Sequence, residues 1–433
     1  MTDTATYQTQ LLRDAASDTM LVEDVTEGLQ SPYTVLFRRD TEQDSQRDDV
    51  VRLRGRLLLP ASEAYERLAQ RFRPLGYTPL LRRDGDRETD VVLALPGAMP
   101  HAKQRVGVAA LLFALTLLSC LFAGAQMVEG LTALNWNLLE GLPYAASLLA
   151  ILAAHEFGHY LMARRLGTPV SLPYFIPMPV GFGTFGAFIN MTAPPRNRRH
   201  LLGIAAAGPL AGLAVALPVL WIGLSLSRVE PLPAAGAYSM EGNSLLYVLM
   251  KFLAFGQILP SNGVDVFIHP VAFAGWAGLL VTALNLIPAG QLDGGHIMYA
   301  LVGEKAARAI YWIVLAALAA LSLLWPGWLL WLGLIFIFGR IRAEPLDDVT
   351  ELTPPQRVLA AVMVLIFFLV FTPVPMTLVQ GPEPPTNPPA TPQTPADGVA
   401  TVSESGWVEL PVFQPATPGG ELRTRRAAQA GST

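Results

Sequence analysis

Long apolar runs alternate with short polar connections through the middle of the chain. A helix needs roughly 20 apolar residues to cross a hydrocarbon layer of about 30 Å. Apolar runs lie near residues 106–128, 143–163, 201–227, 268–288, 306–340 and 357–371. The run 306–340 predicts two helices, because Pro326 and Gly327 within it favour a turn. The pattern predicts a polytopic α-helical membrane protein with about six or seven transmembrane helices.

The N-terminal part of the chain follows a different pattern. Residues 1–30 are polar and are expected to be flexible. Residues 50–59 alternate between apolar and polar positions as a strand does, and residues 61–76 have apolar positions at helical spacing. Two further strand-like stretches flank a turn at residues 84–86. Residues 31–100 therefore predict a small soluble α+β domain.

Composition agrees with this division. The chain has 433 residues, of which 52% are hydrophobic and 15% charged, whereas soluble domains carry about 25% charged residues. Cys120 is the sole cysteine, which excludes an internal disulfide. Basic residues of the N-terminal domain are interspersed with acidic ones, which favours a solvated surface over a nucleic-acid site. Residues 377–433 are rich in Pro and Thr and predict a disordered tail, which leaves residues 104–376 as the transmembrane domain.

The bias of Lys and Arg between the apolar runs predicts the orientation in the membrane. Basic residues cluster before the first run, between the second and the third, and after residue 339, whereas loop 129–142 carries none. The N-terminal domain and the loops 164–200 and 289–305 are therefore expected in the cytoplasm. The basic residues are Lys103, Arg105, Arg164, Arg165, Arg196, Arg198, Arg199, Arg340 and Arg342.

Three polar residues, His155, Glu156 and His159, stand in a run that is otherwise apolar. They form the pattern H-E-x-x-H. Residues four apart share a face of a helix, so both imidazoles can bind one zinc ion, and the glutamate beside them can act as a general base toward water at the metal. An unpaired carboxylate at this depth costs at least about 2.5–3.5 kcal/mol. The alternative is a polar cluster satisfied between helices, which does not account for this particular set of residues.

A catalytic zinc site usually has three protein ligands and leaves the fourth position open for water. The stretch NLIPAGQLDGGH at residues 285–296 follows an apolar run and supplies two candidates for the third ligand. Asp293 is preferred, because the glycines around it let the backbone leave helical geometry and approach another helix closely. His296 is the rival ligand. Asn285 is a candidate hydrogen-bond partner of the substrate, with an interhelical polar contact as the equal alternative.

Two separated motifs give the chain a resemblance to a known family. HEFGH at 155–159 and N-x-x-P-x-x-x-x-D-G at 285–294 resemble the motifs of the site-2 protease family of intramembrane zinc metalloproteases. The stretches AAAGPLAG at 205–212 and GTFGAFINM at 183–191 are also similar to this family. The resemblance covers about residues 140–300.

The resemblance implies a core of three helices in which His155, His159 and Asp293 hold one Zn²⁺ per chain and Glu156 is the catalytic residue. It implies hydrolysis of peptide bonds within or near the transmembrane segments of membrane-protein substrates. The expected partners are these substrates and the lipid bilayer, and not nucleic acid. The motif residues with structural roles are Gly208, Pro209, Gly212, Pro288 and Gly294.

The soluble domain before the spans also bears on the subgroup and the location. No PDZ-like insert is evident between residues 213 and 284. A chain of this organisation most resembles the subgroup that bacteria and plastids share. The expected location is therefore the bacterial cytoplasmic membrane, with the N-terminal domain in the cytoplasm.

Residues 168–193 contain β-branched and aromatic residues between proline and glycine breaks. This pattern predicts a membrane-associated hairpin. Gly183, Thr184 and Phe185 are candidate substrate-binding residues there, since an exposed strand edge can pair with an unwound substrate segment. A structural re-entrant loop is the equal alternative.

Two other functions fit parts of the sequence. A membrane transporter or ion-binding protein would also place charged residues within the membrane, but no repeated halves are evident. A catalytically inactive member of the family would bind transmembrane helices without cutting them, although every motif residue is present in this chain. Zinc content and cleavage distinguish both alternatives from a protease.

Overall fold

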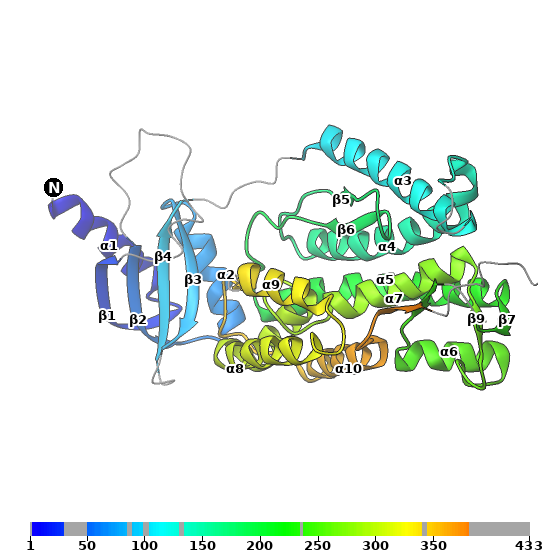
Figure 1. Ribbon diagram of the computed structural model, residues 1–433. Helices are drawn as coiled ribbons and strands as arrows, with labels where there is room; N and C mark the ends of the chain where they lie inside the picture. Colours follow the sequence, from blue (N-terminus) through cyan, green and yellow to red (C-terminus); the bar gives the residue numbers. More distant parts are fainter. Residues whose placement is uncertain are drawn as a thin grey trace, which may run out of the picture. The chain divides into compact units, whose positions relative to one another are not determined.

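A computed structural model describes residues 2–29, 50–84, 89–97, 104–129, 134–233, 237–339 and 344–380. Apart from 233–238 and Gln380, which belong to a second unit, the described residues form one unit. This unit contains an N-terminal sheet and a set of long helices (Figure 1). The expectations for Lys103, Arg340, Arg342 and the tail from residue 381 onward fall outside the described residues.

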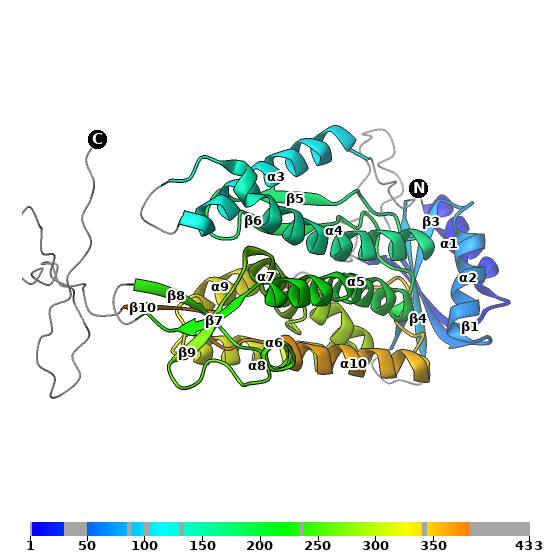
Figure 2. The ribbon, with the colours of Figure 1, turned by 90° about the vertical axis from the view of Figure 1, so that its right-hand side faces the viewer.

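The described part of the N-terminal domain contains four strands and two helices. Its elements are α1 (Thr2–Ala16), β1 (Met20–Leu29), β2 (Val50–Leu57), α2 (Ala61–Phe72), β3 (Tyr77–Arg83) and β4 (Asp90–Pro96). The sheet is antiparallel, with the strand order β1-β2-β4-β3, and both helices pack on one face of it (Figure 2). The alternation along β2 buries Val51 and Leu53 and leaves Arg52 and Arg54 half-buried, as expected for a sheet with one face on a core.

Residues 2–29 differ from the flexible segment that the sequence leads us to expect. They form α1 and β1, and Leu12, Ala16 and Met20 are at most 1% exposed in the core of the domain. The expectation for residues 1–30 is wrong here for two reasons. The buried apolar positions are few and widely spaced in a polar stretch, and β1 gains its hydrogen bonds from β2, which is distant in the sequence.

Three of the described helices are long and apolar enough to cross a membrane. They are α3 (Val106–Glu129), α4 (Leu142–Arg165) and α5 (Arg198–Ser225). The remaining helices are α6 (Leu245–Phe255), α7 (Pro270–Asn285), α8 (Asp293–Leu321), α9 (Trp328–Phe338) and α10 (Pro354–Val370). Except for α8, these are apolar but shorter, because turns and breaks divide the apolar runs. The helix α8 is interrupted at Gly303, where φ is 78°.

The helices α4, α5 and α7 lie side by side (Figures 1 and 2). A Cβ atom on Gly275 of α7 would lie 2.6 Å from the Cα atom of Leu220 in α5. A Cβ atom on Gly158 of α4 would lie 2.5 Å from the carbonyl oxygen of Ala207 in α5. Neither glycine can be replaced without separating the backbones, so these small residues set the close packing of the three helices.

An antiparallel hairpin of β5 (Tyr174–Pro177) and β6 (Thr184–Phe188) confirms the hairpin expected within residues 168–193. The strand β5 packs on α3, where the rings of Phe113 and Phe175 lie 5.1 Å apart. The hairpin is a two-stranded sheet, so among the described residues β6 has a strand partner on one side only. The other strands are β7 (Arg228–Pro231), β8 (Ala237–Glu241), β9 (Val264–Phe267) and β10 (Met376–Gln380), and β7 pairs with β9.

The helix α6 buries a lysine and exposes apolar side chains. Lys251 is fully buried, with its Nζ atom 3.5 Å from Oδ1 of Asp265 and 4.7 Å from the centroid of the Tyr247 ring. The Tyr247 hydroxyl donates a hydrogen bond of 2.8 Å to Glu241. Leu249 and other apolar residues of α6 are exposed. The buried face therefore contains one ammonium group that pairs with one buried acid, Asp265.

Candidate metal centre

Two histidines of α4 face the interior of the helical part. His155 and His159 lie one turn apart, are 3% and 6% exposed, and have their Nε2 atoms 3.1 Å apart. The spacing of four residues places both rings on one helix face, as the sequence predicts. Because the carbonyl oxygen of Ile204 in α5 can only accept, His159 donates from Nδ1 in their 2.7 Å hydrogen bond. The Nε2 atom of His159 then keeps its lone pair for a metal.

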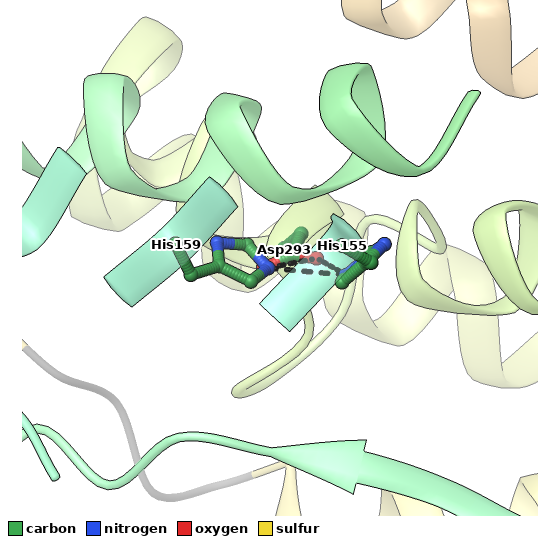
Figure 3. Close-up of side chains that lie close together, drawn as sticks. All are labelled: His155, His159 and Asp293. Carbon is green, nitrogen blue, oxygen red and sulfur yellow. Dashed lines mark hydrogen bonds and ion pairs between the residues drawn. The ribbon is translucent and has the colours of Figure 1, made fainter. Parts of the chain in front are cut away.

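A third group converges on the same point from α8. Asp293 is the first residue of this helix, and its Oδ2 atom lies 3.3 Å from Nε2 of His155 and 3.2 Å from Nε2 of His159. Figure 3 shows the three side chains pointing toward one another. Two ligands of a tetrahedral ion that binds them at about 2.1 Å lie about 3.4 Å apart. The observed separations of 3.1–3.3 Å are close to this value, so the three atoms can hold one metal ion.

His296 does not join this group. It is buried and lines the same cavity, but among the described residues the set that can hold a metal consists of His155, His159 and Asp293. Asn285 at the end of α7 places its Nδ2 atom 3.2 Å from Nε2 of His155. Of the residues considered from the sequence, the structure thus brings Asn285 into contact with the site and leaves His296 beside it.

Glycines of α5 make room for both imidazoles. A Cβ atom on Gly208 would lie 2.0 Å from Nε2 of His159, and a Cβ atom on Gly212 would lie 3.2 Å from Nδ1 of His155. Pro209 is buried between them inside the helix. Packing therefore explains the small residues of the stretch AAAGPLAG, because any side chain at Gly208 would occupy the place of a histidine ring.

The turn between α7 and α8 brings Asp293 to the histidines. It contains Pro288, which lines a small cavity beside His296. Gly294 lets the first turn of α8 approach the end of α7, since a Cβ atom there would lie 2.0 Å from the carbonyl oxygen of Leu286. Gly290 has a φ of 59°, which favours glycine. The glycines of this turn therefore serve the close approach that the sequence predicts.

Glu156 borders two adjoining cavities. One has a volume of about 270 Å³ and contains the three candidate ligands. The other has a volume of about 260 Å³ and is lined mainly by apolar side chains, among them Leu148, Val281 and Trp328. Both cavities are lined by His155, Glu156, Ala187 and Asn285. Glu156 is 5% exposed, so its carboxyl group lies in a site that is largely shielded from solvent.

The hairpin forms one wall of these cavities. Thr184 and Phe185 line the apolar cavity, and Phe185 is 52% exposed. The Thr184 hydroxyl accepts a hydrogen bond of 3.0 Å from the amide of Gly186. Gly183 packs elsewhere, because a Cβ atom there would lie 2.7 Å from the Cα atom of Cys120 in α3. Ala187 and Phe188 of β6 reach the cavity that contains the candidate ligands.

Sequence reasoning does not find two parts of the site. The carbonyl group of Ile204 orients His159, and main-chain groups carry no signal in the sequence. Trp325, Trp328 and Trp331 line the apolar cavity, whereas the sequence indicates only a turn at Pro326 and Gly327. Three tryptophans close together in the sequence indicate that their side chains line the same surface. They do not indicate which site that surface adjoins.

The fold and the site together define a helical membrane protein with a buried candidate metal centre beside a glutamate. Residues 143–324 match the peptidase family M50, which is the site-2 protease family. The chain therefore carries a domain of this family, as its resemblance leads us to expect, and all three candidate ligands lie within the matched region.

Similar proteins are known from plants. The protein described as probable zinc metalloprotease EGY2, chloroplastic, from Arabidopsis thaliana is 34% identical over 236 residues, which is 54% of this chain and 42% of the relative. Its counterpart from Oryza sativa subsp. japonica is 35% identical over 238 residues, 54% of this chain and 43% of the relative. Probable zinc metalloprotease EGY1 of Arabidopsis thaliana is 32% identical over 240 residues, 54% of this chain and 43% of the relative. The matches cover less than half of these relatives. No solved structure matches the chain.

Proposed function

We propose that this protein is an intramembrane zinc endopeptidase that hydrolyses peptide bonds within or near the transmembrane segments of membrane proteins. The observation that carries the proposal is the convergence of His155, His159 and Asp293 at separations of 3.1–3.3 Å, beside a buried glutamate. The match to peptidase family M50 and the names of the plant relatives support zinc as the metal. Two imidazole nitrogens and one carboxylate oxygen are donors that zinc favours.

The proposed roles follow from the positions of the side chains. When bound, zinc supplies a Lewis acid that makes water more acidic and polarises a carbonyl group. Glu156 borders the ligand cavity and is the proposed general base, which takes a proton from the attacking water and passes it to the leaving amine. The proposed role of Asn285, whose Nδ2 atom lies 3.2 Å from Nε2 of His155, is to donate a hydrogen bond to the substrate carbonyl oxygen.

The strand β6 is the proposed docking edge for the substrate. A helix hides its peptide groups, so a transmembrane substrate has to unwind before hydrolysis. Among the described residues, β6 pairs only with β5, while Ala187 and Phe188 reach the ligand cavity. An extended substrate segment can add to such an edge through main-chain hydrogen bonds. Thr184 and Phe185 are then in position to contact its side chains, whereas Gly183 holds the hairpin against α3.

The proposal includes a placement in the membrane. The chain crosses the bilayer about six or seven times. The three long helices each form one span, and the shorter apolar helices α7, α9 and α10 form further spans. It resides in the bacterial cytoplasmic membrane. The N-terminal domain faces the cytoplasm, which agrees with the basic residues at the end of α4 and the start of α5. Membrane-protein substrates and the lipid bilayer are its partners.

Zinc content tests the ligand set. We expect the purified protein in detergent to contain about one zinc per chain, since the described residues contain one group of three ligands. His155→Ala and Asp293→Ala are each expected to lose this zinc, and His296→Ala is expected to retain it, because His296 lies beside the group and not in it. Elemental analysis checks the result. A folded wild-type protein without zinc would contradict the proposal and favour a transport or binding function.

Filling the apolar cavity tests whether it accepts a substrate side chain. Val281→Trp places a large ring in this cavity of about 260 Å³. We expect cleavage of a substrate with a bulky apolar residue beside the scissile bond to fall by about 10–200-fold, the range that apolar pockets give for small changes in fit. Cleavage of a substrate with alanine there should be spared. The two rates are measured on single-span substrates that differ at one residue.

Leu161→Trp is the matched control for this substitution, because Leu161 of α4 is 63% exposed and does not line the cavity. It should leave both cleavage rates unchanged. An equal loss of both rates in Val281→Trp, with its zinc retained, would show that the cavity does not select the substrate residue.

A further inference from the structure

A short segment joins the N-terminal sheet to the helical part. Residues 344–351 lie between α9 and α10, and we call them the strap. On one side, the amide of Leu81 in β3 donates to Leu346, and the amide of Asp348 donates back to Leu81, at 2.8 and 3.0 Å. On the other side, the amides of Leu346 and Asp347 donate to the residues that precede α5, at 2.9 and 2.8 Å. The strap therefore forms main-chain hydrogen bonds to both parts at once.

The conformation of the strap is fixed from within. Asp347 is fully buried, and its Oδ1 atom accepts hydrogen bonds from the amides of Val349 and Thr350 at 2.9 and 3.0 Å. The Thr350 hydroxyl also donates to this carboxylate. A carboxylate that accepts from amides shortly after it in the chain stabilises a tight turn. This turn determines the direction in which the next side chain, that of Asp348, leaves the backbone.

Asp348 connects two helices of the metal site. Its carboxylate accepts two hydrogen bonds from Arg198 at the start of α5, of 2.8 Å from Nε and 3.0 Å from the second guanidinium nitrogen. The Tyr299 hydroxyl of α8 donates to the same carboxylate at 3.0 Å. The side chains of Arg198 and Asp348 are only 20% and 16% exposed. A two-pronged, partly buried pair of this kind holds its geometry much better than an exposed ion pair.

Each of these two helices positions part of the metal site. Later in α5, the carbonyl group of Ile204 accepts from Nδ1 of His159 and so orients that ligand. The helix α8 begins with Asp293, and its break at Gly303 comes after Tyr299, so Asp293 and Tyr299 lie on one continuous helical stretch. A shift of either helix where it contacts Asp348 is therefore transmitted along a rigid helix. In α8 the shift reaches a candidate ligand, and in α5 it reaches the carbonyl group that orients one.

From these contacts, we propose that Asp348 is a positioning residue for the zinc site. It fixes α5 relative to α8, and thereby His159 relative to Asp293, while the strap that carries it is bonded to the N-terminal sheet. The inference rests on the proposed zinc site and adds to it a dependence on the soluble domain. A ligand set held at separations of 3.1–3.3 Å tolerates little relative movement of its helices.

The test is a comparison of zinc affinity in the full-length protein in detergent. Asp348→Asn keeps the size of the side chain but turns an amide group toward Arg198, and Tyr299→Phe removes only one hydrogen bond. We expect a chelator competition to show zinc affinity reduced by about tenfold in Asp348→Asn, the lower end for groups that orient ligands. A smaller loss in the same direction is expected for Tyr299→Phe. The absorption bands of the cobalt-substituted protein should shift in both variants.

Glu351→Gln is the matched control. Glu351 belongs to the same strap and pairs with Arg357, but this pair is exposed, at 67% and 59% for the two side chains. The zinc affinity and the cobalt spectrum of the Glu351→Gln protein should equal those of the wild-type protein. A purely structural weakening of the strap would lower the stability of the variants without shifting the cobalt bands.

The outcomes separate this inference from the proposed function. If the wild-type protein binds zinc and Asp348→Asn has the same affinity and the same cobalt spectrum, the positioning role is wrong and the zinc site stands. If the wild-type protein binds no zinc, the proposed function itself fails. Should Asp348→Asn not fold, Tyr299→Phe decides alone, and wild-type affinity in that variant overturns the proposal.

Discussion

The Glu156→Gln protein is expected to bind zinc normally and to lose cleavage of its substrates by about 10²–10⁴-fold, the contribution of a well-placed general base. Glutamine has the shape of glutamate but does not take up a proton. Glu156 is 5% exposed and borders the ligand cavity without being one of the three candidate ligands, so its replacement removes the base and leaves the ligands in place. Single-turnover cleavage of a membrane-embedded substrate, measured beside zinc content, gives both quantities.

Glu304→Gln provides the comparison, because Glu304 is a half-exposed residue of α8 that pairs with Arg308 on the surface. It should cleave like the wild-type protein. Cleavage at the wild-type rate by Glu156→Gln would refute the assignment of the base. Loss of zinc from that variant would instead assign Glu156 to the ligand set.

The Lys251→Met protein is expected to be less stable by about 3–5 kcal/mol in its free energy of unfolding, as is typical when one partner of a buried ion pair is removed. Lys251 is fully buried, close to Asp265 and to the ring of Tyr247, which in turn binds Glu241. Without the ammonium group, the buried carboxylate of Asp265 loses the cation that pairs with it among the described residues. Denaturant unfolding of the full-length protein in detergent measures the change.

A second substitution distinguishes loss of charge balance from loss of packing. Lys251→Met combined with Asp265→Leu should recover most of the stability, because it removes the main uncompensated charge and keeps the volume filled. Lys305→Met, at an exposed position of α8, should change little. If the double variant is no more stable than Lys251→Met, the contribution of the pair is one of shape and not of charge.

The candidate ligands illustrate what a local pattern can predict. The spacing of His155 and His159 fixes their common face once the segment is helical, and the glycines around Asp293 indicate a close approach of backbones. The structure brings all three side chains together. The spacing alone does not distinguish Asp293 from His296, since both lie in the same turn of the chain, and only the direction in which α8 begins separates them.

Other features depend on partners that are distant in the sequence. Asp348 contacts Arg198 and Tyr299, which are 150 and 49 residues away, and a polar stretch between two apolar runs gives no sign of either contact. The strand β1 is missed for the same reason, because its pairing with β2 and not its own composition makes it a strand. The small residues of α5 are visible in the sequence, but their role as space for imidazole rings is visible only in three dimensions.

The strap also has a consequence for the N-terminal domain taken alone. Because β3 is an edge strand of its sheet, its outer side is free to pair, and Asp347 of the strap forms a single parallel bridge with Leu81 there. A fragment that ends before α3 would lose Leu346 and Val349 from its core and present the main-chain groups of Leu81 to solvent. Open edges of this kind invite pairing with other chains. The N-terminal domain thus relies on a remote part of its own chain to cover this edge and to complete its core.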